Sequence, residues 1–202
     1  MIYMRTLSNI LQKNIISSQF SGVKIYLRTP QFSDFTEWST LRNESRNYLE
    51  PWEPKWSKSS LTKSNYRRRI SRYEQDIRYE RNIPFYIFTL EKNILVGGVS
   101  LSNINRGITQ SCSLGYWIGE KFASQGYMTE SVAVSAGIVF NILKLHRLEA
   151  ACIPENTASR KVLKKVGFTE EGYARKYLQI NGEWKDHNLF ALLSSDNYLK
   201  LK

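Results

Sequence analysis

Cysteine and histidine are scarce in this chain, with 2 residues of each kind. Cys112 and Cys152 supply neither a disulfide framework nor a zinc site, and His146 and His187 add little ligand capacity. The sequence therefore predicts no bound metal. The absence of a disulfide framework also favours a cytoplasmic location.

Long apolar runs are absent as well. No stretch approaches the roughly 18 residues that a membrane-spanning helix needs, so we expect no membrane partner. Residues 1–22 lack a compact apolar segment and a small-residue cleavage site, which argues against a secretory signal. We expect an N-terminal extension here, either an amphipathic lead-in helix or a flexible arm.

Acidic residues are outnumbered, since 18 Asp and Glu face 29 Lys and Arg and leave a net charge of +11. This excess favours partners that carry phosphate, such as nucleotide cofactors or nucleic acid. The 42% hydrophobic and 23% charged residues are ordinary globular usage, which excludes wholesale disorder.

The hydrophobic pattern predicts one α+β domain with a largely antiparallel sheet and the order β-α-α-β-β-β-α-β-α-β-β. Pro51 and Pro54 predict a rigid extended loop over residues 49–54. Gly167 is expected just after a helix end, and Asn181 with Gly182 in the last hairpin turn. Strands are expected near residues 23–29, 84–90, 94–101, 111–119, 147–153, 168–178 and 184–193, and helices near 34–47, 61–81, 129–143 and 156–166.

Two corners between a strand and a helix carry the chemistry. In residues 114–130 a strand ends, Gly126 follows in a loop, and a long helix begins. Consecutive backbone N–H groups at such a helix start suit a pyrophosphate, although the same pattern is commonly only a structural turn. In residues 152–168 a second strand is followed by Asn156 and Ser159 and by a helix that closes with Gly-Phe.

Together these two stretches resemble the acetyl-CoA-binding half of the GNAT acetyltransferases. The motifs in residues 48–54, 171–174 and 181–187 extend the likeness to the branch that acetylates the N-terminal alanine of ribosomal proteins. The resemblance implies a GNAT domain at residues 23–197. The implied fold is a mostly antiparallel twisted sheet with a central splay, flanked by helices.

The resemblance also implies the cosubstrate and its contacts. Acetyl-CoA would lie with its pantetheine arm in the splay, and a backbone N–H of the splayed strand would stabilise the developing oxyanion. Ser159 would protonate or orient the leaving thiolate. The implied cofactor-binding residues are Tyr116, Trp117, Ile118, Gln125, Gly126, Tyr127, Met128, Thr129, Asn156 and Ser159.

The phosphate loop departs from the family pattern. Ala123 stands where Arg or Gln is usual, Ser124 where a second glycine is frequent, and Met128 where Gly or Ala is usual. The backbone cradle can survive these changes because amides bind the phosphates, but one side-chain contact is lost. Cys152, close to the expected thiol, is either a buried strand residue or the partner of CoA in a mixed disulfide.

The acceptor side is less explicit. Glu53 is predicted to bind or deprotonate the acceptor amine and Trp52 to wall its pocket; the alternatives are a solvated carboxylate and a core aromatic. Asp186 is the next candidate base, unless it serves only the hairpin. At pH 7, deprotonation costs an α-amino group about 1.2 kcal/mol and a lysine about 4.6 kcal/mol, which favours an N-terminal acceptor.

We therefore expect acetylation of a protein N-terminus that begins with Ala or Ser, on a ribosomal protein. One alternative acceptor is a small amine, a polyamine or an aminoglycoside. Another alternative is a ribosome- or RNA-binding assembly factor that uses the basic run of residues 67–72, which otherwise is a solvated helix face. In the acceptor loop, the carboxylates of Glu50 and Glu53 lie close to the cations Lys55 and Lys58. This mixed charge disfavours a small polycation as the acceptor, and it also disfavours a very basic ribosomal tail.

Overall fold

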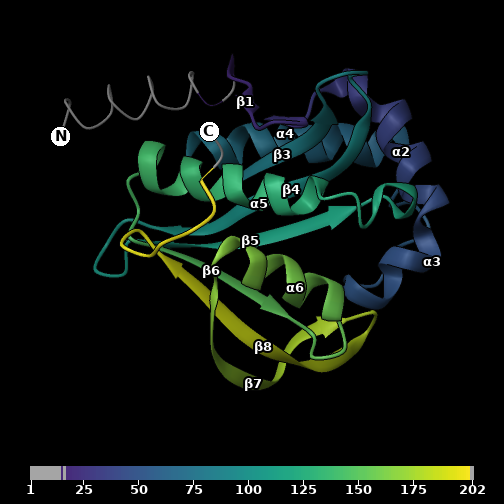
Figure 1. Ribbon diagram of the computed structural model, residues 1–202. Coiled ribbons are helices and arrows are strands. Elements are labelled where there is room, and N and C mark those ends of the chain that lie inside the picture. Colours follow the sequence, from purple (N-terminus) through teal and green to yellow (C-terminus); the bar gives the residue numbers. More distant parts are fainter. Residues whose placement is uncertain (1–14, 16, 201–202) are drawn as a thin grey trace.

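The computed structural model describes residue 15 and residues 17–200, so most of the expected N-terminal extension lies outside the described residues. Its centre is an eight-stranded sheet in the order β1-β2-β3-β4-β5-β6-β8-β7 (Figure 1). Neighbouring strands are antiparallel except β5 and β6, which are parallel. The strands are β1 Phe20–Ser21, β2 Ile25–Arg28, β3 Asn82–Thr89, β4 Leu95–Asn105, β5 Ser111–Ile118, β6 Arg147–Cys152, β7 Thr169–Ile180 and β8 Glu183–Leu193.

Helices cover both faces of this sheet. They are α2 Phe35–Glu44, α3 Arg46–Leu49, α4 Lys63–Arg78, α5 Tyr127–Gly137 with a π-helical continuation at Ile138–Ile142, and α6 Thr157–Val166. Short 3-10 turns lie at Phe32–Asp34, Glu50–Trp52 and Glu120–Phe122. The predicted α+β class and mostly antiparallel sheet are confirmed.

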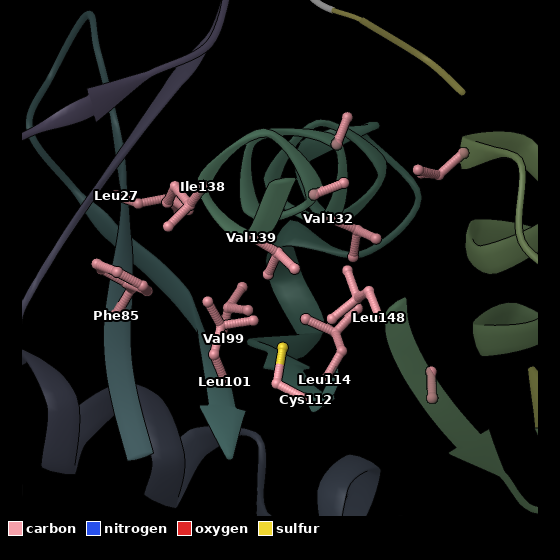
Figure 2. Packing of buried hydrophobic residues seen from close by; sticks show 14 of the residues in the cluster. Leu27, Phe85, Val99, Leu101, Cys112, Leu114, Val132, Ile138, Val139 and Leu148 are labelled. Carbon is pink, nitrogen blue, oxygen red and sulfur yellow. The ribbon is translucent and has the colours of Figure 1, made fainter. Parts of the chain in front are cut away.

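Side chains alternate between the two faces of the sheet along each strand, which builds two hydrophobic layers. Phe85 and Ile87 face the larger core, where α5 and α6 pack, whereas Tyr86 and Phe88 face the smaller core under α2 and α4. Figure 2 shows the larger core, in which Val132 of α5 and Val139 of its π-helical continuation point toward the side chains of β4, β5 and β6. A helix pair therefore covers each face of the sheet.

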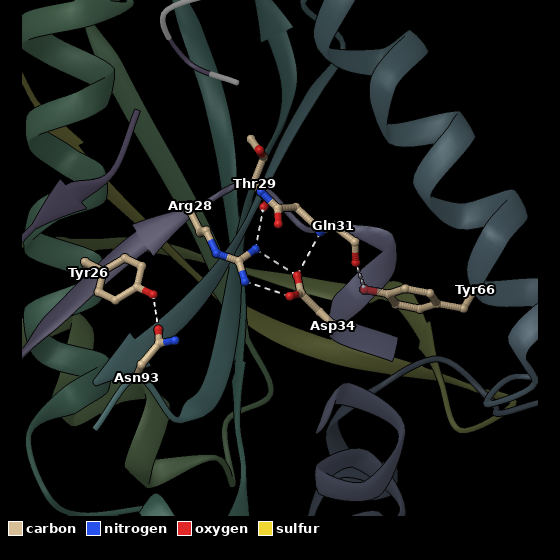
Figure 3. A network of polar contacts seen from close by, with 7 residues as sticks. All are labelled: Tyr26, Arg28, Thr29, Gln31, Asp34, Tyr66 and Asn93. Atoms are coloured by element: carbon tan, nitrogen blue, oxygen red, sulfur yellow. Dashed lines mark hydrogen bonds and ion pairs between the residues drawn. The ribbon is translucent and has the colours of Figure 1, made fainter. Parts of the chain in front are cut away.

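A polar network fixes the helices of the smaller core to the sheet (Figure 3). Arg28 on β2 donates two hydrogen bonds to the carboxylate of Asp34, at 2.8 and 2.6 Å. Asp34 also accepts the backbone N–H of Gln31 at 2.8 Å, and the Gln31 carbonyl accepts the hydroxyl of Tyr66 on α4 at 2.9 Å. The entry into α2 and the first turn of α4 are thus tied to the same strand.

The prediction of an extended loop over residues 49–54 was wrong. Leu49 ends α3, and Glu50–Trp52 continues as a 3-10 turn with Pro51 in its first positions. Proline is tolerated there because its φ is already helical and its missing N–H would have no partner in a first turn. Only at Glu53 does the backbone become extended. In the described part of the chain, no helix is long and apolar enough to cross a membrane.

Candidate active site

The sheet opens between its two parallel strands. Pairing of β5 with β6 stops at Leu114 and Ala150, while β5 continues to Ile118 beside β4 alone. The N–H of Gly119 donates to Val96 of β4 at 2.8 Å. Since backbone groups alternate in direction along a strand, those of Tyr116 and Ile118 face the gap. The expected central splay is therefore present, and it leaves backbone donors and acceptors for a ligand.

A cavity of about 530 Å³ runs along this gap and collects the predicted site residues. All of them except Gln125 line it, and the Gln125 amide instead folds back to donate to the Lys121 carbonyl at 2.9 Å. The lining residues among those predicted are Trp52, Glu53, Tyr116, Trp117, Ile118, Gly126, Tyr127, Met128, Thr129, Asn156 and Ser159.

One end of this cavity is the start of α5. Gly126 is the N-cap residue with φ 86°, and Ser124 holds φ 61°, so a serine adopts the left-handed backbone where the family often has glycine. No atom lies within 4 Å of the position of a Cβ on Gly126, which leaves its backbone open to a ligand. The first N–H groups of a helix have no partner within it, and they attract anions. This end fits a pyrophosphate.

The opposite wall is the start of α6. Asn156 caps the helix, its Oδ1 accepting the N–H of Ser159 at 3.0 Å, so its amide N–H groups are left for the cavity. The Ser159 hydroxyl lies 2.8 Å from the hydroxyl of Tyr116 across the splay. Burial raises the pKa of Tyr116, against the opposing effect of the Ser159 hydrogen bond. The two hydroxyls therefore form a neutral pair that can pass a proton into the cavity.

Cys152 lies at the same place. Its side chain is buried and also lines the cavity. Cys152 is therefore a buried strand residue whose thiol a ligand can reach, and the mixed disulfide with CoA stays a prediction. Burial raises the pKa of the thiol, and the Ser159 hydrogen bond and the charge of Arg160 act in the opposite direction.

Trp52 and Glu53 form a further wall with Tyr48 and Leu49. The Glu53 carboxylate accepts two hydrogen bonds from Arg42, at 2.8 and 2.5 Å, and one from the Trp56 indole at 2.9 Å. Three N–H groups thus donate hydrogen bonds to the carboxylate. To accept a proton, the carboxylate has to use a remaining lone pair or lose one of these hydrogen bonds. This geometry favours a positioning role, and the role of general base stays a prediction.

In the motif of residues 181–187, Asp186 and His187 lie in different surroundings. Asp186 is half-buried and accepts hydrogen bonds from the hydroxyl of Tyr173 and the N–H of Lys176, the latter at 2.7 Å, which fits its structural alternative. His187 is buried, lines the cavity and places Nδ1 3.0 Å from the Lys185 carbonyl oxygen. Sequence reasoning missed His187 because a single histidine in a strand has no signature. No group of three His, Cys, Asp or Glu side chains able to hold a metal occurs among the described residues.

Comparison with known proteins gives a consistent result. The acetyltransferase (GNAT) domain family matches residues 24–169. A probable N-acetyltransferase of Bacillus subtilis, YjcK, is 37% identical over 87% of this chain and 97% of its own length. The [ribosomal protein uS5]-alanine N-acetyltransferase of Escherichia coli is 33% identical over 76% of this chain and 79% of its own. The structure of Mycobacterium smegmatis RimJ in complex with CoA-disulfide is 34% identical with a TM-score of 0.80, covering 87% of this chain and 84% of that one.

Proposed function

This chain belongs to the GNAT family of acetyl-CoA-dependent N-acetyltransferases, and from that premise we propose that its acceptor is the N-terminal α-amino group of a protein. The proposed acceptor begins with Ala or Ser and is a ribosomal protein. We further propose residues 23–197 as the catalytic domain and the cytoplasm as its location.

One observation carries the proposal. A single cavity joins the phosphate-binding end at Gly126, the Ser159 and Tyr116 hydroxyls, and the Trp52 wall. The donors near Gly126 suit the cosubstrate, and the Trp52 wall offers a surface to the acceptor. The likeness to the uS5-alanine and RimJ enzymes supports a protein N-terminus as that second chain.

Backbone groups and one side-chain amide hold the cosubstrate. The backbone amides of residues 126–129 bind the pyrophosphate of CoA, and the backbone groups of Tyr116 and Ile118 hold the pantetheine arm together with the amide of Asn156. A backbone N–H in the splay lies where negative charge develops on the thioester oxygen, and such a fixed dipole is stronger in a cavity that excludes water than in solution. The thioester supplies the activated acetyl group.

Proton transfer is assigned to two places. The Ser159 hydroxyl donates a proton to the leaving thiolate while the Tyr116 hydroxyl, 2.8 Å away, passes its own proton to Ser159, and the proton that the amine releases to water returns to Tyr116. The α-amino group loses its proton at a cost of only about 1.2 kcal/mol at pH 7, so water is a sufficient acceptor. A lysine or a polyamine would need a stronger base.

The decisive experiment compares the N-termini of all cellular proteins by mass spectrometry in cells with and without this enzyme. We expect one or a few Ala- or Ser-starting N-termini to lose acetylation when the gene is deleted, and ribosomal proteins to be among them. Unchanged N-termini, with loss of acetyl groups from a polyamine or an aminoglycoside instead, would refute the proposal.

A further inference from the structure

A second cavity, of about 780 Å³, lies on the acceptor side between α4 and the sheet. It shares Glu53, Gly115, Tyr116 and Trp117 with the cosubstrate cavity, so the two meet at the splay. An acceptor whose amine lies at the splay can extend into this second cavity, and the lining would then contact the residues that follow the amine.

The charges of this lining are almost all of one sign. Five cations and one carboxylate line it: Arg42, Lys55, Arg68, Arg69, Arg72 and Glu53. The single carboxylate is already held by Arg42 at 2.5 Å. In the part of the chain that the structure describes, the other four cations take part in no ion pair.

The helical period explains why these cations converge. Asn65, Arg68, Arg69 and Arg72 are spaced three and four residues apart, which places them on one face of α4, toward the cavity. Arg67 lies on another side, with its guanidinium 5.1 Å from the ring centre of Phe32. The basic run noted in the sequence is therefore split, and only part of it is a solvated face.

Among the described residues, Arg69 is the most buried of the four cations that have no ion pair. It is half-buried, its guanidinium lies 5.1 Å from the Trp38 ring centre, and Nη1 donates to the Tyr73 hydroxyl at 3.3 Å. A partly desolvated guanidinium gains most from a carboxylate, which it can bind with two parallel hydrogen bonds. The cavity thus presents fixed donors for an anion beside aromatic walls.

On this basis we propose that the acceptor protein carries acidic side chains in the few residues that follow its acetylated N-terminus. This inference rests on the proposed function and names its substrate class. A volume of about 780 Å³ lies within the range for small ligands and admits a short peptide segment, not a nucleic-acid duplex. The same cations repel polyamines, aminoglycosides and basic ribosomal tails.

The test uses three peptides that share the start Ala-Ser and continue with three glutamates, three glutamines or three lysines. We expect kcat/KM with acetyl-CoA to be at least tenfold higher for the glutamate peptide than for the lysine peptide, with the glutamine peptide between them. Raising the salt from about 0.05 M to about 0.5 M should shrink this preference, because screening shortens the reach of the cations.

Two charge reversals locate the preference. Arg68→Glu with Arg72→Glu should reduce the ratio between glutamate and lysine peptides at least fivefold while the glutamine peptide changes less than twofold. Arg67→Glu with Lys63→Glu is the matched control, since it changes the same charge on the same helix outside the cavity, and it should leave the ratio unchanged. Circular dichroism of each variant reports whether it folds.

The outcomes separate the two proposals. Acetylation of all three peptides at equal rates, or a ratio that the double variant does not alter, overturns the acidic-acceptor inference and leaves the proposed function standing. No acetylation of any peptide, with an amine such as spermidine accepted instead, overturns the proposed function. Binding of a short RNA duplex that the double variant abolishes, without any peptide preference, assigns the cations to RNA and overturns the inference.

Discussion

Replacing Glu53 by glutamine distinguishes a positioning role of this carboxylate from a role as general base. The ion pair with Arg42 has two short hydrogen bonds and little exposure, since the side chains are 12% and 19% exposed for Arg42 and Glu53. Exposed pairs contribute about 0–1 kcal/mol, and breaking fully buried ones costs about 3–5 kcal/mol. For this intermediate burial we expect Glu53→Gln to lower the free energy of unfolding by about 2 kcal/mol.

We expect the loss of activity in this variant to come from misplaced side chains and not from a missing general base. Because Arg42 and Trp56 would lose the anion that orients them, we expect kcat/KM for an Ala-starting peptide to fall about tenfold, or about 1.4 kcal/mol. This deficit should be the same at every pH, since no titrating catalytic group is removed. A lost general base would instead cost about 10²-fold, and the deficit would shrink above pH 8, where the amine is already neutral.

The assay is a pH–rate profile from about pH 6 to 9.5, with urea unfolding of the same protein. Glu50→Gln is the matched control in the neighbouring turn, because its pair with Arg46 is exposed, at 33% and 42% for the two side chains. We expect Glu50→Gln to change stability by less than about 0.5 kcal/mol. A Glu53→Gln deficit that disappears above pH 8, with unchanged stability, would refute the positioning argument and make Glu53 the base.

Further substitutions test the remaining parts of the site. Gly126→Val should weaken CoA binding at least tenfold by calorimetry, because a β-branched residue resists φ 86° and blocks the open approach to the backbone; unchanged affinity in a folded variant would refute the phosphate-loop assignment. Ser159→Ala should lower kcat about tenfold with little change in the KM for acetyl-CoA, and an unchanged kcat with chemistry rate-limiting would leave Ser159 a helix residue only. Because burial raises the pKa of Cys152, its mixed disulfide with oxidised CoA should form slowly at pH 7 and faster as pH rises, and Cys152→Ser should abolish the adduct in mass spectra. Asp34→Asn should cost about 3 kcal/mol of stability in urea, since it leaves the partly buried Arg28 guanidinium without its carboxylate; a loss below about 1 kcal/mol would contradict this expectation.

The sequence predicted the parts of the molecule that depend on local pattern. Strand alternation, the glycine-containing loop before α5 and Gly167 just after the end of α6 are short-range signals, and the structure places each where it was expected. The turn at Glu50–Trp52 was mispredicted because proline permits both an extended loop and a first helical turn. Sequence alone left the tertiary context of Pro51 open.

Side-chain partners from distant elements were beyond sequence reasoning. The hydrogen bonds from Arg42 to Glu53 and the pairing of Tyr116 with Ser159 join residues whose contact depends on how helices pack on the sheet. The basic run at residues 67–72 was visible as composition, but its division between a cavity and solvent required the orientation of α4. Charge composition therefore predicted an anionic partner without locating it.

The central claim is acetyl transfer from acetyl-CoA to an α-amino group, and its most direct measurement maps the product on a peptide that offers two amines. The purified protein is incubated with acetyl-CoA and an Ala-starting peptide that contains one internal lysine, and fragmentation mass spectrometry locates the acetyl group. We expect the acetyl group on the N-terminal amine alone, and no product from the same peptide with its N-terminus blocked. Acetylation of the lysine, or turnover of the blocked peptide at an equal rate, would contradict the account.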